Sequence, residues 1–550
     1  MIAAAIPRAA SALAPNRDDE TMQAPTQQAT TGGDGTAPED AGWVLGTLIL
    51  VAVVANLNLA VANVALPDIG AAFRATQTAL DLVSVGFSVG LAGTVLYFGA
   101  LGDRYGRKTM LLLGTFLAVP TSLLAAYAPS VEVLVVARVL GGVAAGMAFP
   151  TTLALITALW TGHRRTHAIA LWSAVGGSVA ALGPFLAGLA LHWFWWGSCF
   201  LLTLPLAVVA LVLAWKVVPA HVHETTDPVD HLGGVLSILG IVALIVAINF
   251  APTPGAGGVA IIIGAVALVA LGAFFLRQRT APFPLFDLGI AIRRIFWVAA
   301  VGGLIVFGSL MGAIFIGLQF LQNVMGYSTL RSGAAVIPAA VCMLLVAPQS
   351  AKLIERLGSR YTLLIGYTFC FLGFVVMLVT WTEHSPLAVV VLAFALAGVG
   401  VGLAGTPASH SLTGSVPVRR VGMASATSDL QRDLGGSIMQ SLLGAILTAS
   451  YASDLARTAR STPNLSSNVA DTIERSYASA AAVAQQYPAH APQIISAARR
   501  SFLTGSNWAY LAGCVAIVVG AVVVGAYFPT KDDEARLLTE YAATDATPEA

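Results

Sequence analysis

The sequence predicts an all-α polytopic membrane protein with about fourteen membrane-spanning helices. Hydrophobic residues make up 57% of its 550 residues and charged residues only 10%, whereas an ordinary soluble domain carries about 25% charged residues. The apolar residues fall into long runs, and a helix needs about 20 such residues to cross the hydrocarbon layer of a membrane. A polar loop near residue 104 recurs near residue 356, which indicates an internal repeat.

The apolar runs follow one another along the chain with short polar connections. Backbone N–H and C=O groups inside lipid must be hydrogen-bonded within their own segment, so we expect each run to be a helix. The expected spans lie near 43–66, 80–102, 109–128, 131–158, 168–191, 197–218, 231–251, 258–276, 295–322, 331–350, 361–381, 386–410, 424–450 and 505–528.

The basic residues predict how these spans are oriented, because cytoplasmic loops are enriched in Lys and Arg. With the N-terminus inside, the short outer loops carry only Arg74 and Arg331, while the inner loops carry many basic residues, including Lys108, Arg164 and Arg356. Both termini are therefore expected in the cytoplasm. With its Ala-, Val- and Gly-rich composition, the chain is expected to be a multi-pass protein of a bacterial inner membrane.

The order of spans and the composition of the segments between them predict five regions. They are a disordered cytoplasmic N-terminal tail (1–40), a first six-helix bundle (41–220), two additional transmembrane helices (221–280), a second six-helix bundle (281–530) and a cytoplasmic C-terminal tail (531–550). The second bundle contains a long outer loop, residues 451–504. A helical hairpin and a loose loop are both open for this segment.

The two repeated loops match residue by residue at a constant offset of 252. The first, residues 99–108, reads GALGDRYGRK, and the second, residues 351–360, reads AKLIERLGSR. Asp103 aligns with Glu355, and Arg104 aligns with Arg356. Both loops follow the second span of a bundle on the cytoplasmic side, so the sequence predicts two parallel six-helix halves with two helices between them.

Further motifs accompany the repeat. They are NVALP at 63–67, RVLGG at 138–142, GPFLAG at 183–188, LQFLQ at 318–322 and GYS at 326–328. Together with the repeated loops they resemble the major facilitator superfamily, and best its fourteen-span drug/proton antiporter branch (QacA/EmrB-like). The resemblance implies the major facilitator fold, export by alternating access, and an antiporter motif containing Gly183, Pro184 and Gly188.

Three positions depart from the pattern of that branch. Asn58 stands where the branch has an Asp in the first helix, Gly141 stands where the buried-Arg motif has Gln, and Ala187 stands where the antiporter motif has Gly. The missing acid at position 58 puts in doubt the branch's usual cation recognition and its proton coupling through the first helix.

The repeated loops are the candidate gates. Gly106 permits a tight turn, and Asp103 can pair with a basic residue or accept hydrogen bonds from the N-terminus of a neighbouring helix. A contact that forms in one conformation and breaks in the other biases a two-state rocking motion. The resemblance implies this role for Asp103, Arg104, Gly106, Arg107, Glu355 and Arg356. The alternative is that the loops are solvated basic anchors.

Arg138 is expected about 10 Å below the outer surface in the fourth span. An Arg at that depth costs at least about 2.5–3.5 kcal/mol on insertion scales, less near the interface, and needs a partner, a cavity or a substrate. Asn58, at similar depth, offers only an amide, so the retained positive charge would favour an anionic, zwitterionic or phosphate-bearing amphiphile. The alternative is structural hydrogen bonding of Arg138 to backbone carbonyls and Asn58. Asn56 and Asn63 share a helix face nearly opposite Asn58.

The span near 424–450 carries Asp429, Arg432 and Asp433, and an acid at membrane depth is a functional hypothesis by default. Asp433 is the deeper acid and the preferred proton site, because Asn58 cannot titrate. The alternative is a structural pair centred on Arg432. Gln319 and Gln322, near the outer end of their span, are further candidates for the substrate pathway.

Several function classes are excluded by absent features. The net charge of +1 argues against nucleic acid as a partner, and no GxxxxGK[ST] loop for ATP is present. No nucleophile–base pair or metal-ligand spacing appears, so we expect no catalytic residue, metal, cofactor or enzyme activity.

The expected function is export of small amphiphilic molecules from the lipid bilayer by a monomeric secondary transporter, with the proton gradient as energy source. The alternative is a transporter of an anionic, lipid-like or metabolite substrate with weak or no proton coupling, because Asn58 replaces the acid. A non-transporting receptor or scaffold is a third possibility, which the duplicated loop disfavours.

Overall fold

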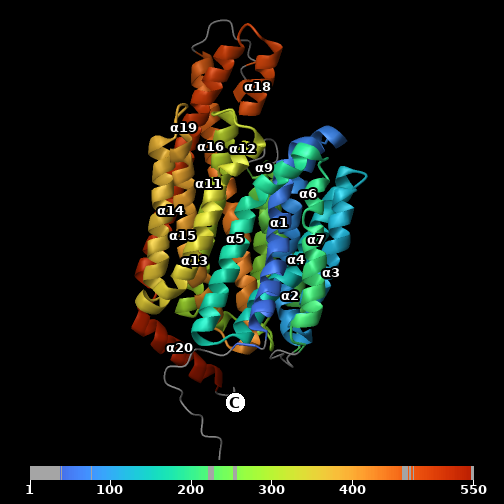
Figure 1. Cartoon of the computed structure of the whole chain (residues 1–550), viewed down its shortest axis with the longest axis vertical. Coiled ribbons are helices and arrows are strands. Elements are labelled where there is room, and N and C mark those ends of the chain that lie inside the picture. The colour runs from blue at the N-terminus through green and yellow to red at the C-terminus, as the bar shows by residue number, and fades with distance from the viewer. Residues whose placement is uncertain are drawn as a thin grey trace, which may run out of the picture. The chain divides into compact units, whose positions relative to one another are not determined.

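The structure is a computed structural model that describes residues 37–546 except 39, 76, 221–227, 252–256, 461–468, 470, 471 and 475. The expected disordered tail, 1–40, lies almost wholly outside the described residues. Every regular element in the described part is a helix, so the all-α prediction is confirmed (Figure 1). Within the same ranges, 13 helices are long and apolar enough to cross a membrane.

The first half of the bundle follows the predicted order of spans. Its helices are α1 (Ala41–Phe73), α2 (Gln77–Tyr105), α3 (Arg107–Ala126), α4 (Val131–Leu159), α5 (Gly162–Trp193), α6 (Ser198–Leu201) and α7 (Leu204–Val217). The Ser130 side chain accepts a hydrogen bond from the Val133 N–H and caps α4. Helices α6 and α7 together make the sixth span.

The two additional helices and the second half come next. They are α8 (His231–Phe250) and α9 (Gly257–Thr280), followed by α10 (Leu288–Ala291), α11 (Arg294–Asn323), α12 (Thr329–Ala334), α13 (Ile337–Leu357), α14 (Ser359–Thr380), α15 (Leu387–Gly414), η1 (Val418–Arg420), α16 (Val421–Arg460), α18 (Tyr477–Gln486), α19 (Ala491–Tyr527) and α20 (Lys531–Ala546). We call α10–α19 the second half.

Helix α16 covers the predicted span 424–450 but is not among the 13. Its apolar run is diluted by charged residues, Asp429, Arg432 and Asp433, and by several Ser and Gln residues. Nevertheless α16 packs against α11 and α19 of the second half and against α2 and α4 of the first. It is therefore an interior helix of the bundle, whose polar residues face protein rather than lipid.

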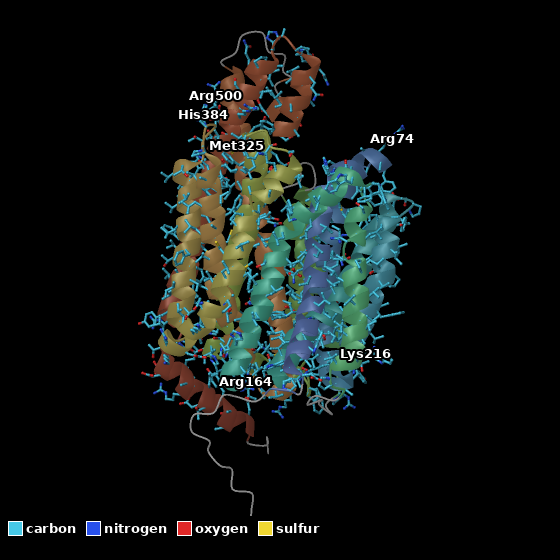
Figure 2. All side chains as sticks on the ribbon, viewed as in Figure 1. Arg74, Arg164, Lys216, Met325, His384 and Arg500 are labelled. Atoms are coloured by element: carbon cyan, nitrogen blue, oxygen red, sulfur yellow. The ribbon has the colours of Figure 1, made fainter. Side chains whose placement is uncertain are left out.

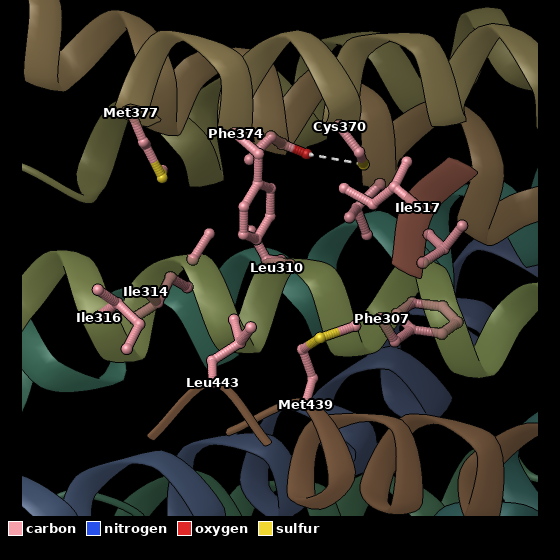
Figure 3. Close-up of a cluster of buried hydrophobic side chains, with 14 of the residues drawn as sticks. Phe307, Leu310, Ile314, Ile316, Cys370, Phe374, Met377, Met439, Leu443 and Ile517 are labelled. Atoms are coloured by element: carbon pink, nitrogen blue, oxygen red, sulfur yellow. Dashed lines mark hydrogen bonds between the residues drawn. The ribbon is translucent and has the colours of Figure 1, made fainter. Parts of the chain in front are cut away.

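Most buried apolar side chains belong to separate cores in the two halves. One large cluster draws almost entirely on α10–α19, and two smaller clusters lie within α1–α7. A fourth, small cluster joins α2 to α8, α9 and Ala426 of α16. Figure 3 shows part of the large cluster, where Leu310 of α11 lies between Phe374 of α14 and the α16 pair Met439 and Leu443. Each half is thus stabilised by its own core, which allows the halves to move as bodies.

The repeated loops adopt matching turns. Gly106 between α2 and α3 has a φ of 107°, and Gly358 between α13 and α14 has a φ of 84°. These values favour glycine, because a Cβ is strained there. The tight turn expected at Gly106 is therefore present. Gly358, which occupies the equivalent position in the second loop, also has a positive φ.

Residues 451–504 are largely helical in their described part, which fits the helical alternative better than the loose loop. Helix α16 continues to Arg460, α18 follows, and α19 begins at Ala491 (Figure 1). Tyr451 donates its hydroxyl to the Ile473 carbonyl at 3.0 Å, which ties the segment together. The C-terminal tail, 531–550, is also mostly helix, as α20.

Candidate functional site

A cavity lies between the two halves, with a volume of about 150 Å³. Its walls come from α1, α2, α4 and α5 of the first half, from α8, and from α11, α15 and α16 of the second half. Most lining side chains are apolar or aromatic, and the polar ones are Asn56, Ser84, Ser88, Asn249, Arg432, Asp433, Ser437 and Gln440. Apolar walls with a few convergent polar groups are typical of sites that bind small molecules.

Arg432 of α16 reaches from the second half to the first at the edge of this cavity. The guanidinium carbon lies 4.5 Å from the ring centre of Trp172 in α5 and 4.6 Å from that of Phe307 in α11. Its Nη2 donates to the Ser173 hydroxyl at 3.2 Å. A guanidinium stacked between two aromatic faces is stabilised by cation–π attraction, so Arg432 links the halves while keeping its charge.

The two acids of α16 differ in exposure to the cavity. Asp433 lines it, while Asp429 is 1% exposed and lies one helical turn away. Both carboxyl oxygens of Asp429 and Oδ2 of Asp433 lack hydrogen-bond partners among the described residues. The alternative of a structural pair between Arg432 and these acids is therefore not what the structure shows. Of the two acids, Asp433 is therefore the one that lines the cavity.

At the end of the bundle that carries Asp103, which we call the Asp103 end, α2 meets the first turn of α16. Asp103 Oδ2 accepts a hydrogen bond from the Gly422 N–H at 3.0 Å. Its Oδ1 accepts from Arg107 Nε and Nη2 at 3.0 and 2.9 Å, and Nη2 also donates to the Val418 carbonyl at 2.9 Å. Asp103 thus has both kinds of partner expected from the sequence, a basic residue and a helix N-terminus.

The contact between α2 and α16 is close enough to require glycine. A Cβ on Gly422 would lie 2.4 Å from Asp103 Oδ2 and 2.5 Å from the Gly99 carbonyl oxygen. Asp103 is 5% exposed and Arg107 2% exposed, so the ion pair is screened from solvent. The two halves are therefore closed against each other at the Asp103 end in this structure.

The second repeated loop makes a more exposed contact at the same end. Glu355 pairs with His163 in the first turn of α5, and the two side chains are 44% and 48% exposed. Lys531 of α20 donates to the Glu355 carbonyl at 2.5 Å. Arg356 is exposed, and Arg104 lies beside Arg419 and Arg420 around a smaller pocket.

The halves also touch at the opposite end, where the structure places the antiporter motif. Within the first half, a Cβ on Gly183 of α5 would lie 2.2 Å from the Ala60 Cβ of α1, whereas Gly188 of α5 faces Leu330 of α12 in the second half. A Cβ on Gly333 would lie 2.9 Å from the Cα of Phe185, the residue after Pro184. Figure 2 shows Arg74, Met325 and His384 at this end, and Arg164 and Lys216 at the Asp103 end.

Arg138 and Asn58 lie together, but they do not line the central cavity. Arg138 donates Nη1 to the Asn58 carbonyl at 2.8 Å and Nε to the Val83 carbonyl at 3.3 Å. This geometry fits the structural alternative, so the placement gives no support to substrate selection by Arg138 in the central cavity. On the opposite face of α1, Asn56 does line the cavity, and the Asn63 side chain lies outside the described residues.

Gln319 and Gln322 also lie away from the central cavity. Gln319 is half-buried and Gln322 is exposed near the end of α11. The structure shows instead a residue that sequence reasoning missed, Asn249 of α8, which lines the cavity from one of the two additional helices. Asn249 could have been identified from the sequence, because it is a lone amide side chain in an otherwise apolar span.

Fold and site together define a polytopic membrane protein whose two helical halves enclose a cavity for a small molecule. Residues 48–439 match the profile of the Major Facilitator Superfamily. The chain belongs to this superfamily, as its motifs led us to expect, and it is a membrane transporter and not an enzyme.

The chain is similar to several named efflux proteins. It is 32% identical over 490 residues to the multidrug efflux pump LfrA of Mycolicibacterium smegmatis. The aligned region covers 88% of this chain and 96% of LfrA. It is 30% identical over 421 residues to the multidrug resistance protein Stp of Mycobacterium tuberculosis, 76% and 77% of the two chains.

A solved structure shares the fold. The human organic anion transporter MFSD10 (TETRAN) superimposes with a TM-score of 0.53 at 14% identity, over 86% of this chain and 99% of that one. At this identity the likeness supports the fold alone.

Proposed function

We propose that this chain exports amphiphilic small molecules across a bacterial inner membrane by alternating access, coupled to proton entry. The observation that carries the proposal is the cavity between the halves, which contacts enclose at both ends and which Asp433 lines. Relatives named as a multidrug efflux pump and a multidrug resistance protein support transport out of the cell and small amphiphilic molecules as the substrate class.

The topology we propose is fourteen spans with the Asp103 end in the cytoplasm. The count adds α16 to the 13 apolar helices, since α16 packs between helices of both halves. The basic residues gathered near the Asp103 end, with Arg164 and Lys216 among them (Figure 2), favour the cytoplasmic side for that end and for both termini.

The alternating step is the breaking of the Asp103 contact. This contact is polar and local, joining one carboxylate to one helix N-terminus and one Arg. When it opens, the cavity becomes accessible from the cytoplasm, and when it closes, the contacts of α5 with α12 can separate instead. Each half keeps its own core during this motion.

Proton coupling is assigned to Asp433, the acid among the described residues that line the cavity. A deprotonated Asp433 attracts the cationic or hydrogen-bond-donating part of an amphiphile, and protonation removes that attraction. Substrate and proton therefore compete for one group, which is the requirement for exchange. The protein acts as a monomer, and the proton gradient supplies the energy without a cofactor.

The test is substrate flux in proteoliposomes with and without an imposed pH gradient. Asp433→Asn is expected to abolish the part of the flux driven by the gradient, because the amide does not titrate. Ser437→Ala is a matched control, since it changes a neighbouring polar lining residue without a titratable group. Gradient-driven flux that survives in Asp433→Asn would refute the assignment.

A second candidate is transport of anionic amphiphiles, and the observation that favours it is Arg432. Its guanidinium lines the cavity, and its Nε has no hydrogen-bond partner among the described residues. Flux of a matched anionic and cationic dye pair separates the two candidates. Faster flux of the anionic dye, lost in Arg432→Gln, would favour this second function.

A further inference from the structure

A second pocket lies inside the first half and takes no part in the proposed transport path. It is small, with a cavity volume of about 20 Å³, and is lined by small and apolar residues of α1–α4, together with Asn58, Thr115, Thr121, Ser122, Arg138 and Phe200. Ala55 of α1 is the one described residue that also lines the central cavity. Helix α1 therefore separates the two spaces.

Arg138 is the charged group of this pocket, and it is only 2% exposed. Its guanidinium carbon lies 4.9 Å from the ring centre of Phe87 and 5.5 Å from that of Phe200. Nη1 and Nε donate to two backbone carbonyls, as described above, but Nη2 has no partner among the described residues. One donor of a buried cation is therefore left without an acceptor.

The other polar groups of the pocket do not supply the missing negative charge. None of the described lining residues is acidic. Thr115 and Thr121 donate their hydroxyls to carbonyls of their own helix, Leu111 and Leu117, at 2.7 and 2.8 Å. A buried charge without a countercharge carries a desolvation penalty of several kcal/mol, and aromatic faces and carbonyls offset only part of it.

We propose that this pocket binds a monovalent anion, with Arg138 Nη2 as its principal donor. The anion is a free halide or the carboxylate group of a short amphiphile, since both bring one negative charge to the Nη2 donor in a small site. The site lies between α1, α3 and α4, so its occupancy stabilises the first half. A water molecule would satisfy the Nη2 donor but would leave the charge uncompensated.

The experiment measures thermal unfolding of the full-length protein in detergent at constant pH and ionic strength. Sodium bromide and sodium butyrate are each compared with sodium gluconate, whose anion is too bulky and polar for the pocket. A ligand that binds only the folded state raises the unfolding midpoint, here by roughly 2–4 °C at saturating anion. The anion whose effect on the midpoint saturates at the lower concentration shows whether the pocket prefers a halide or a carboxylate.

The decisive variant is Asn58→Asp, which adds a carboxylate to the same pocket and keeps the packing. It is expected to raise the midpoint in gluconate and to remove the response to bromide and butyrate, because the countercharge is then built in. Asn56→Asp, on the opposite face of α1, is the matched control and keeps the response.

Direct observation completes the test without a variant that risks misfolding. Crystals grown in bromide are expected to show anomalous scattering beside Arg138. Equal midpoints for the unaltered protein in all three salts, or an undiminished anion response in Asn58→Asp, would overturn the proposal. Neither result depends on substrate flux, so it leaves the proposed transport function to its own test.

Discussion

The two copies of the repeated loop reach different structures from nearly the same residue pattern. In the first copy Asp103 is buried and binds Arg107 and the Gly422 N–H, which joins the two halves. In the second copy Glu355 is 44% exposed and pairs with His163 across the halves. Both loops thus carry an acid at the same position, but the contact of Asp103 between the halves is buried and that of Glu355 is exposed.

One aligned position explains much of this difference. Ser359 stands in the second loop where the first has Arg107, so Glu355 has no basic partner within its own loop. Ser359 instead donates its hydroxyl to Glu534 of α20 at 2.7 Å, and Ser411 donates to the same carboxylate at 3.3 Å. The C-terminal helix α20 therefore packs on the second loop and supports it, whereas the first loop joins one half to the other.

The largest effect is expected from Asp103→Asn. The change removes the countercharge of Arg107, and leaving a buried charge unpaired costs about 3–5 kcal/mol. Export measured in proteoliposomes is expected to fall at least about tenfold, because closure at the Asp103 end is weakened by that free energy. Export near the wild-type rate would show that Asp103 is a solvated anchor and not a gate.

A somewhat smaller effect is expected from Gly422→Ala, which adds a Cβ against Asp103 and the Gly99 backbone. Overpacking of this kind costs about 1–3 kcal/mol, so α2 and α16 should separate more often. The measurement is the rate at which a water-soluble thiol reagent labels Ala426→Cys on α16. Gly414→Ala is the control, because its Cβ would meet only the Arg165 Nη2, at 3.8 Å. Equal labelling in both glycine variants would contradict the close contact.

The brace formed by α20 should depend on pH. Burial raises the pKa of Glu534, and hydrogen bonds from Ser359 and Ser411 lower it by less. A raised pKa in the docked state means that docking is strongest at pH below the ordinary Glu range and weakens as pH rises through the raised pKa. A spin label at Ala542, which is exposed, should therefore become more mobile with rising pH.

Glu534→Gln is the matched variant for this titration. The amide keeps the shape of the protonated acid but cannot ionise, so the mobility of the label at Ala542 should no longer change with pH. An unchanged pH response in Glu534→Gln would mean that another group controls the docking of α20.

The smallest effect is expected from Glu355→Gln. A solvent-exposed ion pair contributes about 0–1 kcal/mol, and the Lys531 contact uses the Glu355 backbone and is unaffected. Export should change by less than about twofold in the assay used for Asp103→Asn. A loss of export as large as that caused by Asp103→Asn would show that the two loops contribute equally to transport, which contradicts the comparison.

Much of the fold could be predicted from the sequence, because lipid requires long apolar helices and because the repeat marks the two halves. The partners of Asp103 were also foreseeable, since a carboxylate at a helix end has few ways to be satisfied. The face of each helix was harder to predict. Asn56 and Asn58 were correctly expected on different faces of α1, but only the packing of α1 against α4 and α5 determines which face meets the central cavity.

Other features depend on contacts between distant residues that no local pattern encodes. Asn249 reaches the cavity because α8 packs beside α2 and α16. Glu534 is buried because Ser359 and Ser411 happen to converge on it from α14 and α15. Hydropathy alone also fails to identify α16 as a membrane span. An interior helix surrounded by other helices tolerates charged residues that a lipid-facing helix does not.

The most direct test of the account measures distances between paired spin labels at the two ends of the bundle. One pair, at Arg164 and Leu357, spans the halves at the Asp103 end, and the other, at Arg74 and His384, spans them at the opposite end. Alternating access predicts that substrate or a change of pH lengthens one distance while it shortens the other. Two distances that change in the same direction, or that do not change at all, would contradict alternating access around the central cavity.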